Sequence, residues 1–434
     1  MKTMRISIWS EARLKAPRKV PLYAGFAATG VAFTLPGTAL PLLLLRWSMS
    51  DTRGGLLLFC FYSLGIFGAY CARGRMHLSL ARGSLLTALG AICLSWAGRW
   101  SAYAAIALFG FGLALTMTSI SLLVSQRFPL QRRTELMRLN LVWALGAAMG
   151  PWIALQSTRL TPAPIHKTTR ATLQAVTHGS ELSANSLLHL QHVLLGVTLF
   201  FVLAAGWAAW IEGRPEPAES SATASETDPP PRPEPEPSSL PRPQPGLGVP
   251  WTLLALIFAA TGVEAAAGGW LTSYAQRAGD SLGITIGAAT FLWVGSLLSR
   301  VLHSTTWISR LPERTVLGSS VLVMAASLAL LIAWPASLVT LLAAGILGLA
   351  TGPVYPLLLA VTLRHRESSL AFTIAALGSA LLPLATGSVS SWTHSLRAGL
   401  GMPFLAAAGM VLLVAASRRA LQGKEEDVPA ALLG

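Results

Sequence analysis

The residue best placed to do chemistry in this 434-residue chain is Glu264, an acidic side chain in the middle of a long apolar run. The other 17 of the 18 acidic residues fall in predicted loops, in the termini or in a Pro-rich connection. An ionised side chain at the centre of a bilayer costs about 3 kcal/mol, so it is expected to face a cavity or a partner. We therefore predict that Glu264 exchanges protons or binds a ligand.

Two features of the surrounding sequence bear on this role. No Lys, Arg or His is predicted at comparable depth, so a proton, a cation or a hydrogen-bonding ligand is the expected companion of Glu264. On an ideal helix Gly268 lies on the same face as Glu264, whereas Trp270 and Tyr274 lie about 80 to 120° around the helix axis from it. The Gly268-Gly269 pair is expected to loosen the helix and bring Trp270 inward. The alternative is a protonated glutamic acid that only packs against a neighbouring helix.

Aromatic and amide side chains in the apolar runs are candidates to complete a ligand site. Four aromatic residues are predicted to stack on a sugar face or on an apolar ligand: Trp270, Tyr274, Tyr355 and Trp143. Asn140 is the predicted polar contributor. The alternatives are interfacial aromatic belts, which account for most Trp and Tyr in membrane proteins, and a backbone or headgroup contact for the amide.

The other reactive residue types indicate neither catalysis nor metal binding. His189 and His192 are one helical turn apart but lack a third ligand. The three cysteines lie in or at the ends of apolar runs, without metal-ligand spacing. The sequence has no Gly-rich phosphate loop with a Lys and no nucleophile motif. We expect no enzymatic activity, no metal and no cofactor.

The elements that position Glu264 are predicted to be membrane-spanning helices. The chain is 53% hydrophobic and 12% charged, with a mean hydropathy of +0.57, whereas soluble domains are about 25% charged. Apolar runs of about 20 residues match a hydrocarbon core about 30 Å thick, and backbone exposed to lipid must be helical. Twelve spans are predicted, near 20–45, 54–72, 79–97, 101–125, 137–157, 188–211, 250–275, 282–302, 315–334, 337–362, 369–391 and 397–417.

The basic residues predict how these spans are oriented. If the termini and every second loop share one side, that side holds 24 of the 32 Lys and Arg, and the other side holds 8. This positive-inside asymmetry places both termini in the cytoplasm and requires an even number of spans. It accounts for the formal charge of +14 without a nucleic-acid partner. The predicted location is the inner membrane of a bacterium, as a multi-pass protein.

A Pro-rich segment divides the predicted spans into six and six. Residues 212–248 are dominated by Pro, Glu, Ser and Thr, cannot bury a core and are predicted to be a disordered cytoplasmic linker. The predicted organisation is a cytoplasmic leader at 1–19, an N-terminal six-helix half at 20–211, the linker, a C-terminal six-helix half at 249–417 and a cytoplasmic tail at 418–434.

The two halves repeat each other at an offset of 232 residues. Phe26–Val31, which reads Phe-Ala-Ala-Thr-Gly-Val, recurs unchanged at Phe258–Val263. The Ala-Leu-Gly of residues 144–146 recurs at 376–378. Six spans return the chain to its starting side, so the halves are predicted to be parallel repeats.

With these spans, linker and repeats, the chain resembles the major facilitator superfamily over nearly all of both halves. Residues 68–75, Gly-Ala-Tyr-Cys-Ala-Arg-Gly-Arg, resemble the loop motif of that family, with Ala72 in place of its usual Asp. The second half repeats the Gly-x4-Arg spacing and ends it at Arg300, with Ser299 before the Arg. The resemblance implies that Arg73 and Arg300 belong to gating loops.

Two stretches are also similar to the fucose-permease-like sugar:proton symporters. They are Gly262-Val263-Glu264 followed by Gly269-Trp270, and residues 348–356, Gly-Leu-Ala-Thr-Gly-Pro-Val-Tyr-Pro. Those symporters resemble each other in having carboxylates in their first and fourth helices. This chain has no Asp or Glu in either predicted helix.

Together these features predict an all-α secondary transporter that works by alternating access of its two halves. The leading hypothesis is proton-coupled symport of a sugar or a similar polar solute, with Glu264 carrying the proton. The alternatives are a proton-driven exporter of amphipathic compounds, favoured by 14 Trp and few polar side chains, and a non-transporting sensor with the same fold. The expected partners are a small-molecule substrate, protons and the lipid bilayer.

Overall fold

The computed structural model describes residues 19–72, 74–128, 132–159, 182–212, 250–278, 282–303, 311–362 and 368–416. These residues are helical and contain no β-strand, which confirms the predicted all-α class for this part of the chain. The helices are α2 (Lys19–Arg46), α3 (Asp51–Tyr70), α4 (Met76–Trp96), α5 (Ser101–Arg127), α6 (Arg132–Arg159), α8 (Leu182–Glu212), α9 (Trp251–Arg277), α10 (Leu282–His303), α11 (Glu313–Ala333), α12 (Ser337–Thr362), α13 (Ser368–Thr393), α14 (Leu396–Gly399) and α15 (Gly401–Ala416).

Ten segments among the described residues are long and apolar enough to cross a membrane, with α14 and α15 counted as one segment. The remaining long helices are α6 and α10. α6 carries four charged residues in its first seven positions, which lowers its mean hydropathy. The exact number of spans and the side of each terminus stay predictions, as do the leader, linker and tail, which fall almost wholly outside the described residues.

The last predicted span is interrupted, because the chain folds there as the short α14 and the longer α15. Gly399 and Gly401 flank Leu400 at the break, and glycine costs about 1 kcal/mol relative to Ala in a helix interior. Pro403 then lies in the first turn of α15, where its missing N–H is tolerated. A continuous helix would place the Pro403 ring against the carbonyl of Gly399.

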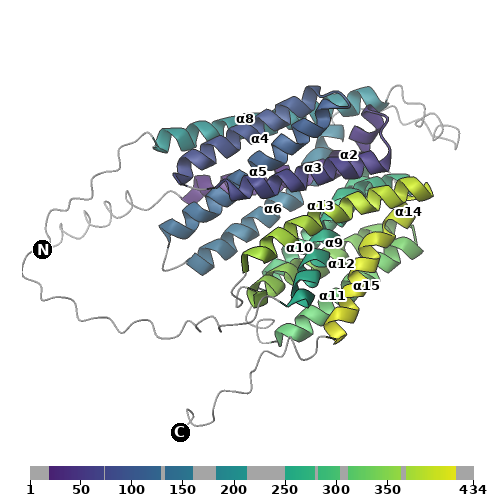
Figure 1. The fold of residues 1–434 in the computed structure, drawn as a ribbon. Coiled ribbons are helices and arrows are strands. Elements are labelled where there is room, and N and C mark those ends of the chain that lie inside the picture. Colours follow the sequence, from purple (N-terminus) through teal and green to yellow (C-terminus); the bar gives the residue numbers. More distant parts are fainter. Residues whose placement is uncertain are drawn as a thin grey trace, which may run out of the picture.

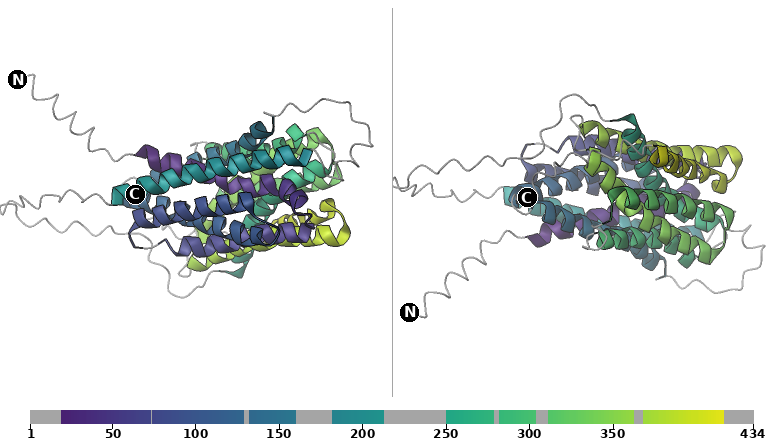
Figure 2. Two further views of the ribbon diagram at one scale, coloured as in Figure 1. Left: turned by 90° about the horizontal axis from the view of Figure 1, so that it is seen from above. Right: turned by 90° about the horizontal axis from the view of Figure 1, so that it is seen from below.

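The helices form two bundles that lie side by side. In Figure 1 the bundle of α2 to α8, coloured purple to teal, lies against the bundle of α9 to α15, coloured green to yellow, and the views in Figure 2 agree. The most extensive contacts between the bundles, within the described residues, are those of α3 with α13, α6 with α10, and α2 with α9. The interface between the bundles therefore includes α9, the helix that carries Glu264.

The 232-residue repeat in the sequence has a counterpart in the packing. In the first bundle α2 crosses α6 at Gly146, where a Cβ atom would lie 2.7 Å from the carbonyl carbon of Ala27. In the second bundle α9 crosses α13 at Gly378, where a Cβ atom would lie 2.9 Å from the carbonyl carbon of Phe258. Gly378 is 232 residues after Gly146, so the same close helix approach is built twice with the same residue type.

Candidate functional site

Glu264 lies near the middle of α9, the helix in the second bundle that packs against α2 of the first. Pro250 precedes the first turn of α9, and the helix then runs without a break to Arg277. The neighbours of Glu264 along the chain, Val263 and Ala265, are buried, but the Glu264 side chain is 25% exposed. Glu264 is therefore only partly enclosed in a helix that is otherwise mostly buried.

Arg300 is the charged partner of Glu264. An Nη2 atom of Arg300 lies 4.0 Å from Oε1 of Glu264, and the Arg300 side chain is 21% exposed. The expectation that no cation lies near Glu264 is thus wrong. Arg300 is three residues before the end of α10, and its long side chain reaches from that end to the acid on the adjacent helix α9. The residue predicted for a gating loop is therefore part of the Glu264 site.

The Arg300 guanidinium also contacts the first bundle. Its central carbon lies 5.1 Å from the ring centroid of Trp143 on α6, which is within the range of a cation–π interaction. Two buried donors at this contact, Nε of Arg300 and Nε1 of Trp143, have no hydrogen-bond partner among the described residues. The ion pair is thus joined to the opposite bundle through an aromatic face, with unused donors on both side chains.

Aromatic rings from both bundles form a wall beside this contact. Phe33 lies at its centre, with ring centroids 5.3 Å from Trp143, 6.0 Å from Trp293 and 5.9 Å from Tyr62. Trp143 and Trp293 are 6.0 Å apart, almost perpendicular, and join α6 to α10. These separations are typical of attractive aromatic pairs. We refer to Phe33, Tyr62, Trp143 and Trp293 as the aromatic wall.

Glycine and phenol groups complete the surroundings of Glu264. Gly268, one turn along α9, leaves room for Trp293, because a Cβ atom there would lie 3.0 Å from its Cζ2 atom. The phenols of Tyr62 on α3 and Tyr355 on α12 lie near the Glu264 carboxyl group. The candidate site therefore contains groups from both bundles and lies between them.

The structure brings only some of the predicted site residues together. Trp143, Tyr355 and Arg300 are near Glu264. Asn140 is exposed, and its amide nitrogen donates a hydrogen bond to the carbonyl of Leu136 in its own helix (3.0 Å). Arg73 lies outside the described residues.

Trp270 and Tyr274 belong to the core. Trp270 is 0% exposed, and its indole N–H donates to the carbonyl of Pro383 on α13 (2.9 Å). The buried hydroxyl of Tyr274 donates to the carbonyl of Leu331 on α11. The expected loosening at Gly268-Gly269 is not observed, because α9 is continuous there and keeps Trp270 on a different face from Glu264.

Trp270→Phe is accordingly expected to affect stability rather than ligand affinity. The substitution leaves the Pro383 carbonyl without its donor, which costs about 1–3 kcal/mol. We expect a lower midpoint of thermal unfolding in detergent and unchanged affinity for any ligand of the site. Trp143→Phe is the matched comparison, and we expect it to weaken that affinity. A loss of affinity in Trp270→Phe at unchanged stability would place Trp270 back in the site.

Two acidic residues that the sequence placed in loops are buried in the structure. Glu135 is 0% exposed in the first turn of α6, where the hydroxyl of Tyr23 donates to its carboxylate and Arg138 forms an ion pair with it (2.9 Å). Asp51 is buried in the first turn of α3. Both helices begin a few residues before the predicted spans, which moves these acids from loops into helix N-termini, where negative charge is favourable.

Asp51 joins the two bundles at one end of the molecule. Its carboxylate accepts two hydrogen bonds from Arg277 at the end of α9 (2.6 and 2.5 Å) and one from Ser390 on α13 (2.5 Å). The neighbouring backbone N–H of Thr52 donates to the hydroxyl of Ser391 (2.8 Å). We refer to Asp51, Arg277 and Ser390 as the latch. The predicted topology places this end outside the cell.

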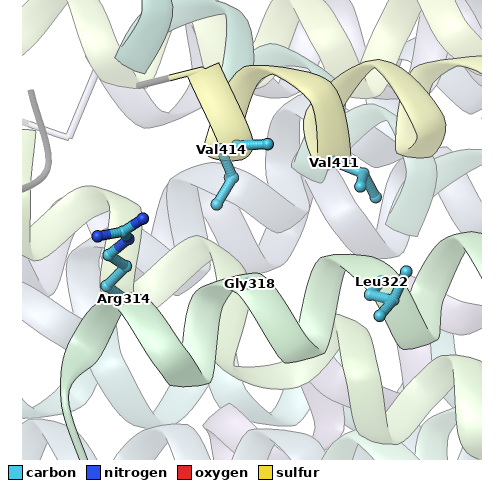
Figure 3. Close-up of a pocket in the computed structure, with 6 residues that line it drawn as sticks. Arg314, Gly318, Leu322, Val411 and Val414 are labelled. Carbon is cyan, nitrogen blue, oxygen red and sulfur yellow. The ribbon is translucent and has the colours of Figure 1, made fainter. Parts of the chain in front are cut away.

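A surface groove lies apart from the candidate site. It has a volume of about 230 Å³ and is lined by Arg314, Gly318 and Leu322 of α11 and by Val411, Val414 and Ala415 of α15. Figure 3 shows the two helices facing each other across it, with Arg314 at one end. None of these lining residues belongs to α9 or α10, the helices that carry Glu264 and Arg300.

Comparison with solved structures gives matches over nearly the whole chain. A bacterial homologue of the human lysosomal transporter Spinster, in an inward-facing and occupied conformation, is 15% identical, with 91% of this chain and 94% of that chain covered and a TM-score of 0.61. The nucleoside transporter NupG is 13% identical, with coverages of 92% and 97% and a TM-score of 0.64. The transporter FucP in the outward conformation is 17% identical, with coverages of 91% and 97% and a TM-score of 0.55.

The chain therefore has the major facilitator fold, as its repeats and motifs predicted. FucP, the fucose:proton symporter of E. coli, is among the matches, in agreement with the resemblance to fucose permeases. Comparisons with protein-family models and with curated protein sequences give no match.

Proposed function

We propose that this chain is a secondary active transporter that moves a small organic solute by alternating access and couples the movement to protons through Glu264. The observation that carries the proposal is the Glu264–Arg300 pair, which lies between the two bundles, is partly exposed on both side chains and has a 4.0 Å separation. In proteins of this fold the two halves rock around a site at their interface. An acid in that position is a functional candidate by default.

In the proposed cycle, protonation of Glu264 removes the negative charge opposite Arg300. The Arg300 guanidinium, held over Trp143 of the other bundle, is then available to the solute. Rearrangement of the bundles exposes the site to the opposite side, where the proton and the solute leave. The return of the carboxylate restores the ion pair and resets the site. In this cycle the proton acts by changing the partner of Arg300.

A second candidate function is proton-driven export of amphipathic compounds, which the aromatic wall favours. Sugar sites need several convergent hydrogen-bonding groups, whereas sites for apolar ligands need few. The described surroundings of Glu264 contain the four rings of the wall, of which Phe33 and Tyr62 are partly exposed, together with the phenol of Tyr355 and one guanidinium. This composition favours a solute with an apolar, planar part over a simple sugar.

Uptake into proteoliposomes tests the proposal. Purified protein is reconstituted with an imposed proton gradient and supplied with labelled fucose, benzenesulfonate or tetraphenylphosphonium, each from a different solute class. We expect gradient-driven flux of at least one solute, and its loss when a protonophore collapses the gradient. Flux equal to that of protein-free liposomes for every solute would contradict transport, and flux insensitive to the protonophore would contradict proton coupling.

A further inference from the structure

We infer that the solute is an organic anion with a planar apolar body, whose carboxylate or sulfonate binds Arg300 while its body lies against the aromatic wall. This inference rests on the proposed function and names the class of substrate for the same site. It is carried by the excess of hydrogen-bond donors over acceptors around Glu264 and by the apolar rings beside them.

The donors around the site lack acceptors. Arg300 presents five N–H groups, and its Nη2 atom is 4.0 Å from the Glu264 carboxylate, beyond the 2.7–3.2 Å typical of a hydrogen bond. Within the described part of the chain, its Nε atom and the Nε1 atom of Trp143 are buried and have no hydrogen-bond partner. Buried donors are costly to leave unpaired, so a ligand that supplies acceptors here is favoured. A carboxylate or sulfonate supplies acceptors only.

The same geometry disfavours the other two solute classes. A sugar hydroxyl donates as well as accepts, and its donors would compete for the single carboxylate of Glu264. A lipophilic cation would normally lie on an aromatic face, but the guanidinium of Arg300 already occupies the face of Trp143 at 5.1 Å and would repel it. An anion meets the guanidinium fork in its preferred bidentate geometry.

Phe33 and Tyr62, the partly exposed rings of the aromatic wall, are the apolar surface for the rest of such a solute. Phe33 packs on Trp143 of the first bundle and on Trp293 of the second, so a planar body placed on Phe33 lies at the junction of the two bundles. Aromatic contacts of this kind add attraction beyond that of the area they bury. The headgroup then provides charge recognition, and the wall provides affinity for the apolar body.

The Glu264–Arg300 pair also determines whether affinity for the anion rises or falls with pH. The titratable or charged groups described as facing Glu264 are Arg300 on α10, Tyr62 on α3 and Tyr355 on α12. Of these, Arg300 alone carries a full charge at neutral pH. Protonation of Glu264 frees Arg300 for the anion, so one proton enters with one negative charge and transport is electroneutral. Affinity for the anion rises as the pH falls.

Binding of matched acids and amides to the purified full-length protein tests this inference. The probes are benzoate, phenylacetate and naphthoate with the corresponding amides, and binding is followed by intrinsic tryptophan fluorescence at acidic and at neutral pH. We expect at least one carboxylate to bind about tenfold more tightly than its amide, a difference of about 1.4 kcal/mol, and more tightly at the acidic pH. Equal affinity of acid and amide, or no binding of any carboxylate, would overturn the inference.

Variants and flux separate this inference from the proposed function. Arg300→Gln is expected to bind acid and amide equally, Arg300→Lys to retain part of the preference, and Arg314→Gln on α11 to behave like the wild type. Flux of benzenesulfonate, which stays charged and does not cross lipid, is measured in proteoliposomes. Carboxylate binding that depends on Arg300 without any flux would overturn the transporter and keep the anion site. Proton-driven flux of fucose or tetraphenylphosphonium alone would keep the transporter and overturn the anion site.

Discussion

Glu264→Gln is expected to abolish proton-driven accumulation of the solute, with a fall of at least about tenfold in the accumulation ratio. The amide has nearly the shape of the carboxyl group but cannot take up or release a proton. It also leaves Arg300 permanently without its counter-charge, so the anion site stays available. We therefore expect solute exchange down its own gradient to persist. The measurement compares gradient-driven uptake with exchange in the same proteoliposomes.

A matched control is Glu313→Gln, which changes an exposed acid in the first turn of α11 in the same half. That variant should keep both uptake and exchange within about twofold of the wild type, since exposed substitutions have small effects. Full proton-driven accumulation in Glu264→Gln would show that the coupling proton is carried elsewhere. Loss of both activities with normal folding would indicate that Glu264 binds the solute directly.

Breaking the latch is expected to open the molecule at the Asp51 end. Asp51→Asn removes the charge that binds Arg277 and weakens the acceptor for the Ser390 hydroxyl. These three side chains join the two bundles. Loss of one partner from a fully buried pair costs about 3–5 kcal/mol. The Arg277 side chain is 44% exposed, so we expect a smaller effect of about 1–2 kcal/mol. This corresponds to a shift of about tenfold toward states open at that end.

Spin labels can measure this shift directly. Trp100, between α4 and α5, and Trp392, near the end of α13, are exposed and belong to different bundles. With Cys60, Cys71 and Cys93 replaced by Ser and labels attached at both tryptophan positions, electron–electron distance distributions report the separation of the bundles. We expect a larger population of long distances in Asp51→Asn than in the parent. Identical distributions would mean that the Asp51 contacts do not hold this end closed.

The course of the helices was largely predictable, because hydrocarbon thickness sets span length and apolar runs are easily recognised. The repeat was also informative: Gly146 and Gly378 share an offset with the Phe26 and Phe258 motifs, and both glycines lie at equivalent helix crossings. The break at Leu400 was missed. It depends on two glycines and Pro403 inside a run whose average hydropathy is high throughout.

Of the interacting pair at the candidate site, only the acid, Glu264, was predicted from the sequence as its central residue. Glu264 was identified because a charge is rare at that depth, but Arg300 was assigned to a loop because it lies near a helix end. Side-chain reach and helix packing decide that contact, and neither appears in a hydropathy profile. Helical periodicity already placed Trp270 away from Glu264, and the continuous helix keeps it there. Phe33 and Trp293 carried no signal, because apolar rings in a span are indistinguishable from lipid-facing ones.

If the proton moves with the solute through Glu264, a solute gradient alone should drive protons across the membrane. Proteoliposomes are loaded with a pH-sensitive dye, no pH gradient is imposed, and a solute gradient is applied with benzenesulfonate or with whichever tested solute is transported. We expect internal acidification in the wild type and none in Glu264→Gln, which still exchanges labelled solute. Acidification at the same rate in Glu264→Gln would contradict this expectation.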